Sequence, residues 1–100
     1  MKKQETKFRE KVRPYLNKLP NSWWESVQQK SIRGTPDIIG CINGQFIAIE
    51  LKSEKGKPSP LQNYKLERIR DAKGIAVSIK PSQWDEFYSD LKKIAFAIHP

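Results

Sequence analysis

The dipeptide Asn43-Gly44, placed between two apolar runs, is the feature that most constrains how this chain can fold. A two-residue hairpin loop of type I′ needs positive φ at both central residues, and Asn-Gly is strongly preferred there. The sequence therefore predicts a β-hairpin whose strands cover about 36–42 and 45–52. A turn of this kind also sets the register, so each residue on one strand acquires a defined partner on the other.

Three charged side chains of this hairpin point the same way. Counting outward from Ile42 opposite Gln45 places Asp37 opposite Glu50, and the Cβ atoms of such a pair lie about 4.5–5.5 Å apart. Lys52 is two residues beyond Glu50 and shares its face. Facing carboxylates are destabilising unless something compensates them. One explanation is a divalent cation held between them, and the other is ordinary strand-end charge with a cross-strand ion pair to Lys52.

Length and charge suggest one small domain with a polyanionic partner. A chain of 100 residues is expected to form a single domain, residues 1–100. With 37% apolar residues its core is small, and a homodimer would extend it. The net charge of +8 favours nucleic acid as partner, ahead of an anionic membrane, although solubility alone is a simpler explanation.

No segment of the sequence has the features of a membrane span or a secretion signal. An apolar run of about 18 residues is absent, so no span is expected. Met1-Lys2-Lys3 is followed by polar residues, unlike a signal peptide. The single Cys41 cannot form an internal disulfide, which suits the cytoplasm.

Hydrophobic periodicity predicts an α/β fold in the order α-β-β-β-α-β-α. Outside the hairpin, the expected elements are helices over 4–19, 60–72 and 83–93 and strands over 23–28 and 75–79. The apolar run 95–98 fits a short additional strand after this order. The connection through helix 60–72 has the length of a parallel crossover, which gives a mixed central β-sheet flanked by helices. Adjacent Trp23 and Trp24 should point to opposite faces of their strand, one into the core and one to the surface.

The first helix carries a carboxylate on its apolar side. Glu5 falls inside the predicted apolar stripe, whereas Glu10 falls on the solvated side. A carboxylate on a buried stripe indicates a partner or a cation. However, Glu5 also lies in the first helical turn, where negative charge suits the helix dipole. Both interpretations are open. The stripe itself consists of Phe8, Val12, Tyr15, Leu16 and Leu19.

The candidate ligands are hard oxygens, which select Mg²⁺ or Mn²⁺ over Zn²⁺. Asp37 and Glu50 supply carboxylates, and no Cys/His cluster has zinc spacing. His99 is the only histidine and stands next to last, so a histidine general base is not expected. A cation that activates water, with Lys52 to orient that water or neutralise developing charge, fits phosphodiester hydrolysis.

The same residues resemble a known nuclease signature. Pro36-Asp37 followed by Glu50-Leu51-Lys52 is similar to the PD-(D/E)xK motif. The fuller pattern resembles the virus-type replication-repair nuclease (VRR-NUC) branch, which is related to Holliday junction resolvases. That pattern comprises Gly34-Thr35-Pro36-Asp37-Ile38-Ile39-Gly40, Gly44-Gln45-Phe46-Ile47-Ala48-Ile49-Glu50-Leu51-Lys52 and Ser59-Pro60-Leu61-Gln62.

The resemblance implies a restriction-endonuclease-like fold and Mg²⁺- or Mn²⁺-dependent cleavage of DNA. It assigns Asp37, Glu50 and the Leu51 carbonyl to the metal, and Lys52 to the water and transition state. An acid from the first helix is usual in the family, and the stripe argument selects Glu5 for it. The branch also carries a glutamine at the position of Gln62. Ser59-x-x-Gln62 is, however, equally a helix capping box, which would explain Gln62 without chemistry.

The expected substrate is DNA recognised by structure rather than sequence, such as branched, nicked or flap DNA, in a phage or mobile-element setting within the host cytoplasm. The alternative is a non-catalytic nucleic-acid-binding module that retains the nuclease fold. A module of that kind would not need facing carboxylates at Asp37 and Glu50. The candidate phosphate contacts around the site are Lys30, Arg33, Lys55 and Lys57.

Overall fold

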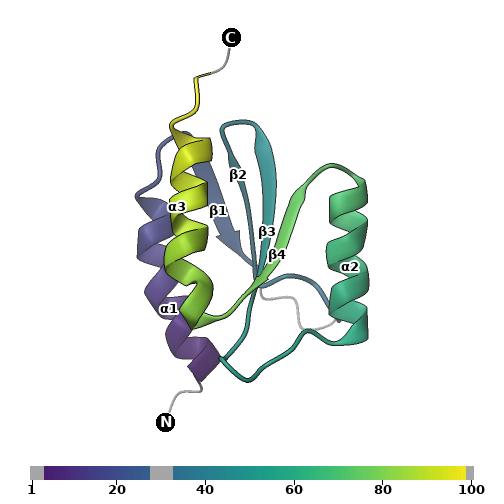
Figure 1. Cartoon of the computed structure of the whole chain (residues 1–100). Helices are drawn as coiled ribbons and strands as arrows, with labels where there is room; N and C mark the ends of the chain where they lie inside the picture. The colour runs from purple at the N-terminus through teal and green to yellow at the C-terminus, as the bar shows by residue number, and fades with distance from the viewer. Residues whose placement is uncertain (1–3, 28–32, 99–100) are drawn as a thin grey trace.

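The computed structural model of the chain describes residues 4–27 and 33–98 and has the predicted α/β order (Figure 1). Lys30 and His99 lie outside the described residues. A short 3₁₀ helix, η1, precedes the last helix. The elements are α1 (Gln4–Asn17), β1 (Ser22–Ser26), β2 (Ile38–Ile42), β3 (Gln45–Leu51), α2 (Pro60–Asp71), β4 (Ile75–Ile79), η1 (Pro81–Gln83) and α3 (Trp84–Ala95).

The strand expected over 95–98 is wrong. Ala95 completes α3, and Phe96 is its C-cap, with its N–H directed to the carbonyls of Lys92 and Ile94. The N–H groups of Phe96 and Ala97 thus still bond to carbonyls of α3, and residues 95–98 contribute no strand.

The four strands form one mixed sheet in the order β1-β2-β3-β4. β1, β2 and β3 are antiparallel neighbours, and the α2 crossover makes β4 parallel to β3. The hairpin turn has positive φ at Asn43 (51°) and Gly44 (84°), as a type I′ loop requires. The predicted register is confirmed from Ile42 opposite Gln45 to Ile38 opposite Ile49.

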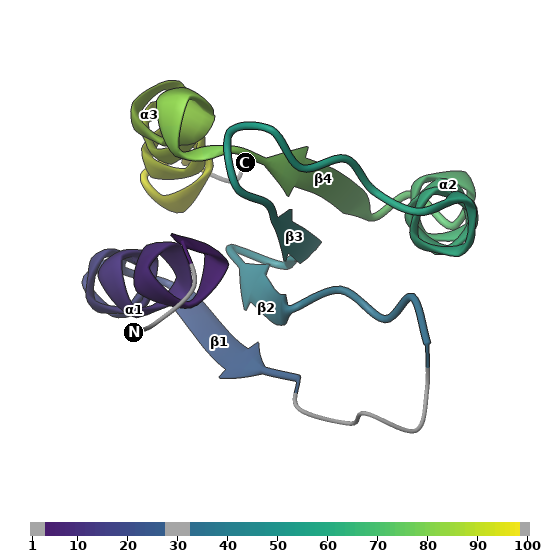
Figure 2. The same ribbon diagram turned by 90° about the horizontal axis from the view of Figure 1, so that it is seen from below.

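Helices α1 and α3 cover one face of the sheet (Figure 2). The α1 stripe is buried as predicted at four of its five positions, and Tyr15 lies at its margin with its ring edge against Trp84 and Tyr88. The buried side chains of this main core include Phe8, Val12, Leu16, Trp24, Ile38, Ile47, Ile49, Leu51, Trp84 and Leu91.

Helix α2 lies on the opposite face, and its apolar contacts there are confined to a small cluster. Leu66 and Ile69 of this helix pack over Ala48, Ala76 and Ile39. Side chains of the same face on β1 and on the outer part of the hairpin stay exposed. The small size of this second cluster explains why part of the sheet is uncovered.

The two tryptophans of β1 divide as predicted. Trp24 is 6% exposed in the main core, whereas Trp23 is 58% exposed on the other face. Gly40 makes room for this arrangement, because a Cβ at that position would lie 2.3 Å from the Trp24 ring.

All three helices begin at the end of the sheet where β2 starts and β3 finishes (Figure 1). The N-terminal turns of α1 and α2 and the loop after β3 therefore gather around the residues of the nuclease-like motif. None of the described helices has the length and apolar character needed to cross a bilayer.

Candidate active site

Asp37 and Glu50 lie where the hairpin register places them. The last paired residues of β2 and β3 are Ile38 and Ile49, and the next step outward brings Asp37 opposite Glu50. A side-chain hydrogen bond and a charge interaction join the two carboxyl groups. Because Ile38 and Ile49 exchange backbone hydrogen bonds in this register, Asp37 and Glu50 occupy the kind of position at which facing side chains come closest.

Glu50 is a buried acid whose charge is poorly accommodated. Its residue is only 3% exposed, and Oε2 is buried with no hydrogen-bond partner among the described residues. Burial, together with the hydrogen bond and negative charge of Asp37, raises the pKa of Glu50 from 4.5 to about 8. The charge of Glu5 raises this pKa further, whereas that of Lys52 lowers it. Without a cation, Glu50 therefore carries a proton at neutral pH.

Asp37 is held from two sides. Its Oδ1 accepts a hydrogen bond from Arg9 Nη2 at 2.9 Å, and its Oδ2 accepts one from the Leu51 N–H at 2.8 Å. The Asp37 backbone carbonyl also accepts a hydrogen bond from the Val27 N–H, at 2.8 Å. A carboxylate oxygen has more than one lone pair, so both oxygens retain acceptor capacity. Asp37 is thus fixed in position while each oxygen keeps a lone pair that could bind a cation.

The backbone N–H of Leu51 is directed to the site. In an antiparallel ladder a residue presents its N–H and its C=O to the same neighbouring strand. The Leu51 N–H is directed at Asp37, and the next N–H along the chain, that of Lys52, is directed to the Ile79 carbonyl on the other side. By the same pattern we expect the Leu51 oxygen on the Asp37 side, and its part as a metal ligand stays a prediction.

Helix α1 contributes two residues to the site. Glu5 is half-exposed and close enough for its charge to act on Glu50, whereas Glu10 is exposed. Sequence reasoning missed Arg9, the counter-ion of Asp37. The available signal was its spacing, because Arg9 follows Glu5 by four residues and so shares its side of the helix. Arg9 Nε and Arg13 Nη1 are buried without partners among the described residues.

Gln62 is placed as a helix cap. Its Oε1 accepts the Ser59 N–H at 2.8 Å, and its own N–H donates to Ser59 Oγ at 3.1 Å. This is the capping box that the sequence offered as an alternative. A catalytic part for Gln62 remains a prediction.

The Gly34-Thr35-Pro36 lead-in of the motif packs on the start of α2. Gly34 has φ of 79°, and a Cβ there would lie 2.8 Å from Leu61 Cγ. Thr35 Oγ1 accepts a hydrogen bond from Lys65 Nζ at 3.4 Å. These contacts fix the segment that delivers Asp37 to the site.

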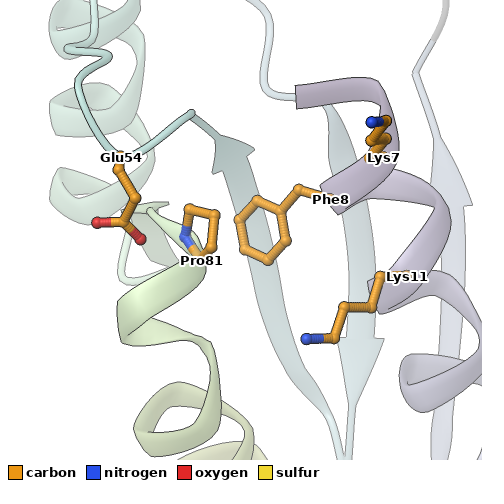
Figure 3. Close-up of a pocket in the computed structure, with 5 residues that line it drawn as sticks. All are labelled: Lys7, Phe8, Lys11, Glu54 and Pro81. Atoms are coloured by element: carbon orange, nitrogen blue, oxygen red, sulfur yellow. The ribbon is translucent and has the colours of Figure 1, made fainter. Parts of the chain in front are cut away.

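A cleft of about 350 Å³ opens at the same end of the sheet, between α1, η1 and the loop after β3 (Figure 3). Phe8 and Pro81 face each other across it, and Lys7, Lys11 and Glu54 lie at its rim. Glu54 also accepts hydrogen bonds from the N–H and hydroxyl of Ser82. The predicted phosphate contacts Arg33, Lys55 and Lys57 are exposed.

The residues present suit one hard cation that needs few protein ligands. No group of three or more His, Cys, Asp or Glu side chains in residues 4–27 and 33–98 is arranged to hold a metal. Mg²⁺, however, commonly uses one or two carboxylates and fills its remaining positions with water and substrate phosphate. The unpartnered Glu50 Oε2 and the Asp37 carboxylate could supply two such carboxylate ligands.

No family model, curated protein or solved structure matches this chain. The sequence motif and the chemistry of Asp37, Glu50 and their neighbours are therefore the features that indicate a function.

Proposed function

We propose that this protein is a metal-dependent endonuclease that hydrolyses DNA phosphodiester bonds, of the PD-(D/E)xK type and similar to the VRR-NUC branch. The observation that carries the proposal is the buried Glu50 carboxyl group, which faces Asp37 and leaves one oxygen without a partner among the described residues. Burying an acid against a second carboxyl group is costly unless a cation compensates them. The net charge of +8 suits a polyanionic substrate.

In this proposal Asp37, Glu50 and the Leu51 carbonyl hold Mg²⁺ or Mn²⁺, which when bound lowers the pKa of water and neutralises charge on a phosphate oxygen. Arg9 and the Leu51 N–H keep the Asp37 carboxylate aimed at the site. Glu50 must release its proton to become a ligand, and the charge of Lys52 favours that release. Lys52 can also orient the attacking water or stabilise negative charge that develops on the phosphate.

The proposed substrate is structured DNA, such as branched, nicked or flap DNA, cut in the manner of a Holliday junction resolvase. Exposed Arg33, Lys55 and Lys57 can contact phosphates, and such contacts orient a duplex without reading its sequence. A homodimer of a phage or mobile-element type, acting in the cytoplasm, is the assembly and setting that the resemblance and the composition favour.

The test is cleavage of supercoiled plasmid and of labelled flap, splayed-arm and four-way-junction DNA with Mg²⁺ or Mn²⁺. We expect nicking that stops in EDTA and is lost in Asp37→Asn and Glu50→Gln. Asp90→Asn is a matched control, because Asp90 is an exposed carboxylate of α3. If no DNA form is cut with either metal, or if Asp37→Asn cuts as fast as the wild-type protein, the nuclease proposal is wrong.

A non-catalytic nucleic-acid-binding module is the second candidate. The Arg9–Asp37 ion pair favours it, since Asp37 already has a counter-ion without any metal. This candidate expects DNA binding that is insensitive to Mn²⁺ and to Asp37→Asn, with no cleavage of any substrate in the panel.

A further inference from the structure

Three side chains form a row across the part of the sheet that the α2 cluster leaves uncovered. Trp23 on β1 is opposite Cys41 on β2, and Cys41 is opposite Phe46 on β3. Directly opposed residues share a face, so all three point to the α2 side of the sheet. Trp23 is 58% and Phe46 42% exposed, and Cys41 is exposed as well. We call Trp23, Cys41 and Phe46 the aromatic row.

The aromatic row lies on the same face as the candidate active site. Cys41 on β2 is four residues from Asp37, which directly precedes that strand, and Phe46 is four residues from Glu50 on β3. An even spacing keeps the side chains on one face, and four residues of strand span about 13 Å. Ile39 and Ala48, the pair between the row and the site, lie under α2. A polymer strand that passes through the site could therefore reach the row on the β1 side, past exposed Glu25.

Cations line the side of α2 that borders this open face. Leu61 contacts Gly34 and Lys65 donates to Thr35, so the side of α2 that carries them is turned toward the β1–β2 loop. Arg68 is seven residues from Leu61 and three from Lys65, which places it on that same side of the helix. Phe46 packs beside Gly74, and the Lys73 carbonyl accepts a hydrogen bond from the Gln45 side chain. The segment that follows α2 therefore lies next to the β3 end of the row.

We infer that the aromatic row is a binding surface for unpaired nucleotides of a DNA strand that leads into the Asp37–Glu50 site. Exposed aromatic rings beside a positively charged groove are the combination that binds single-stranded nucleic acid, because every base has a face that can stack. A paired duplex keeps its bases stacked on each other and offers the rings no such face. This inference rests on the proposed nuclease function and narrows its substrates to DNA with an unpaired strand next to the cleavage position.

Charge decides between this occupant and a second copy of the chain. The basic residues at or just after the side of α2 that faces this part of the sheet are Lys65, Arg68 and Lys73, against one acidic residue there, Asp71. On β1, Glu25 is two residues from Trp23 and on the same face. A second protein molecule of net charge +8 would bring like charge to this border, whereas a phosphate backbone brings opposite charge.

The experiment measures binding of the full chain in EDTA, where no cleavage can occur. The probes are an oligothymidylate of about 12 nucleotides, within the site sizes of single-strand binders, and a blunt hairpin duplex. Trp24 and Trp84 are buried, so quenching of tryptophan fluorescence by the oligonucleotide reports on Trp23. Cys41 is the only cysteine, and its alkylation rate reports whether the row is covered.

We expect Trp23→Ala and Phe46→Ala each to weaken oligothymidylate binding by about 5- to 100-fold and to change duplex binding less than twofold. Trp23→Phe should keep most of the affinity while losing the quenching. Bound oligothymidylate should slow Cys41 alkylation. Phe96→Ala, at an exposed phenylalanine after α3, is the control and should bind like the wild-type protein. Circular dichroism melting checks that each variant is folded.

Three results would overturn the inference. The first is that the alanine variants bind oligothymidylate as tightly as the wild-type protein. The second is that Cys41 is alkylated equally fast with and without oligothymidylate. The third is that high protein concentration alone shields Cys41, which would assign the face to a second copy of the chain. Because binding is measured without metal, single-strand binding through the row without any cleavage would sustain this inference while refuting the nuclease proposal. Metal-dependent cleavage that is unchanged in Trp23→Ala and Phe46→Ala, without single-strand binding through the row, would support the nuclease proposal and refute this inference.

Discussion

Arg9 Nη2 lies 2.9 Å from Asp37 Oδ1, so a residue from the first helix neutralises the carboxylate at the start of β2. The interaction joins positions 28 residues apart in the sequence. It ties α1 to the hairpin at the point where the candidate cation would bind, and it holds one Asp37 oxygen while the Leu51 N–H holds the other.

Replacing Arg9 should destabilise the metal-free protein. Arg9→Met removes the counter-ion and leaves Asp37, whose side chain is only 18% exposed, with one hydrogen bond fewer. Since Arg9 is itself partly exposed, we expect the free energy of unfolding to fall by about 1–2 kcal/mol in urea denaturation. Lys93→Met, which breaks the exposed Asp90–Lys93 pair, is the control and should cost less than about 0.5 kcal/mol. Equal losses of unfolding free energy in Arg9→Met and Lys93→Met would contradict a specific stabilising interaction between Arg9 and Asp37.

Glu50 should make the metal-free protein less stable as pH rises. Its pKa is about 8 in the folded chain against an ordinary 4.5, so between these values the folded state binds more protons than the unfolded state. The free energy of unfolding therefore falls as pH increases through this range, by up to about 4 kcal/mol. Glu50→Gln removes the cost of ionisation, so it should be nearly neutral at pH 5 and stabilising at pH 8.

Urea denaturation in EDTA at several pH values between 5 and 8 tests this prediction. Asp90→Asn, at an exposed carboxylate, should keep the pH dependence of the wild-type protein. If Glu50→Gln lowers stability by the same amount at both ends of the range, Glu50 is not held protonated by the fold.

The hairpin and its register could be predicted from sequence because one local feature determines them. Asn43 and Gly44 adopt the positive φ angles of the turn, and every pair from Ile42–Gln45 outward follows from that turn. That Asp37 lies opposite Glu50 could therefore be predicted from the hairpin alone. Patterns of this kind are reliable where local geometry alone sets the outcome.

The remaining parts of the site depend on packing between distant segments. Arg9 reaches Asp37 only because α1 lies against the sheet at a particular angle, and periodicity cannot give that angle. The depth at which Glu50 is buried likewise depends on the loops around it. The strand predicted over 95–98 is wrong because a short apolar run fits either a strand or the end of a helix, and here the hydrogen bonds of α3 continue into it.

Metal binding should release a proton at neutral pH. Glu50 carries a proton in the metal-free protein and must lose it to bind a cation. Titration of Mn²⁺ by calorimetry, in two buffers with different heats of protonation, should give close to one proton released per ion at pH 7 and almost none at pH 9. Binding at pH 7 without proton release would show that Glu50 is not a ligand. Asp90→Asn should release as many protons as the wild-type protein.

Glu5→Gln should impair metal-dependent activity more than Glu10→Gln. Both residues are carboxylates of α1, but Glu5 acts on Glu50 through its charge, whereas Glu10 is exposed. Loss of a residue that supports a metal ligand commonly costs about tenfold or more, so we expect at least that decrease in Mn²⁺-dependent nicking for Glu5→Gln. Because Glu5 raises the pKa of Glu50, Glu5→Gln should also move the pH midpoint of proton release downward. Equal nicking activities and unchanged pH midpoints of proton release in the two variants would show that Glu5 only stabilises α1 through the helix dipole.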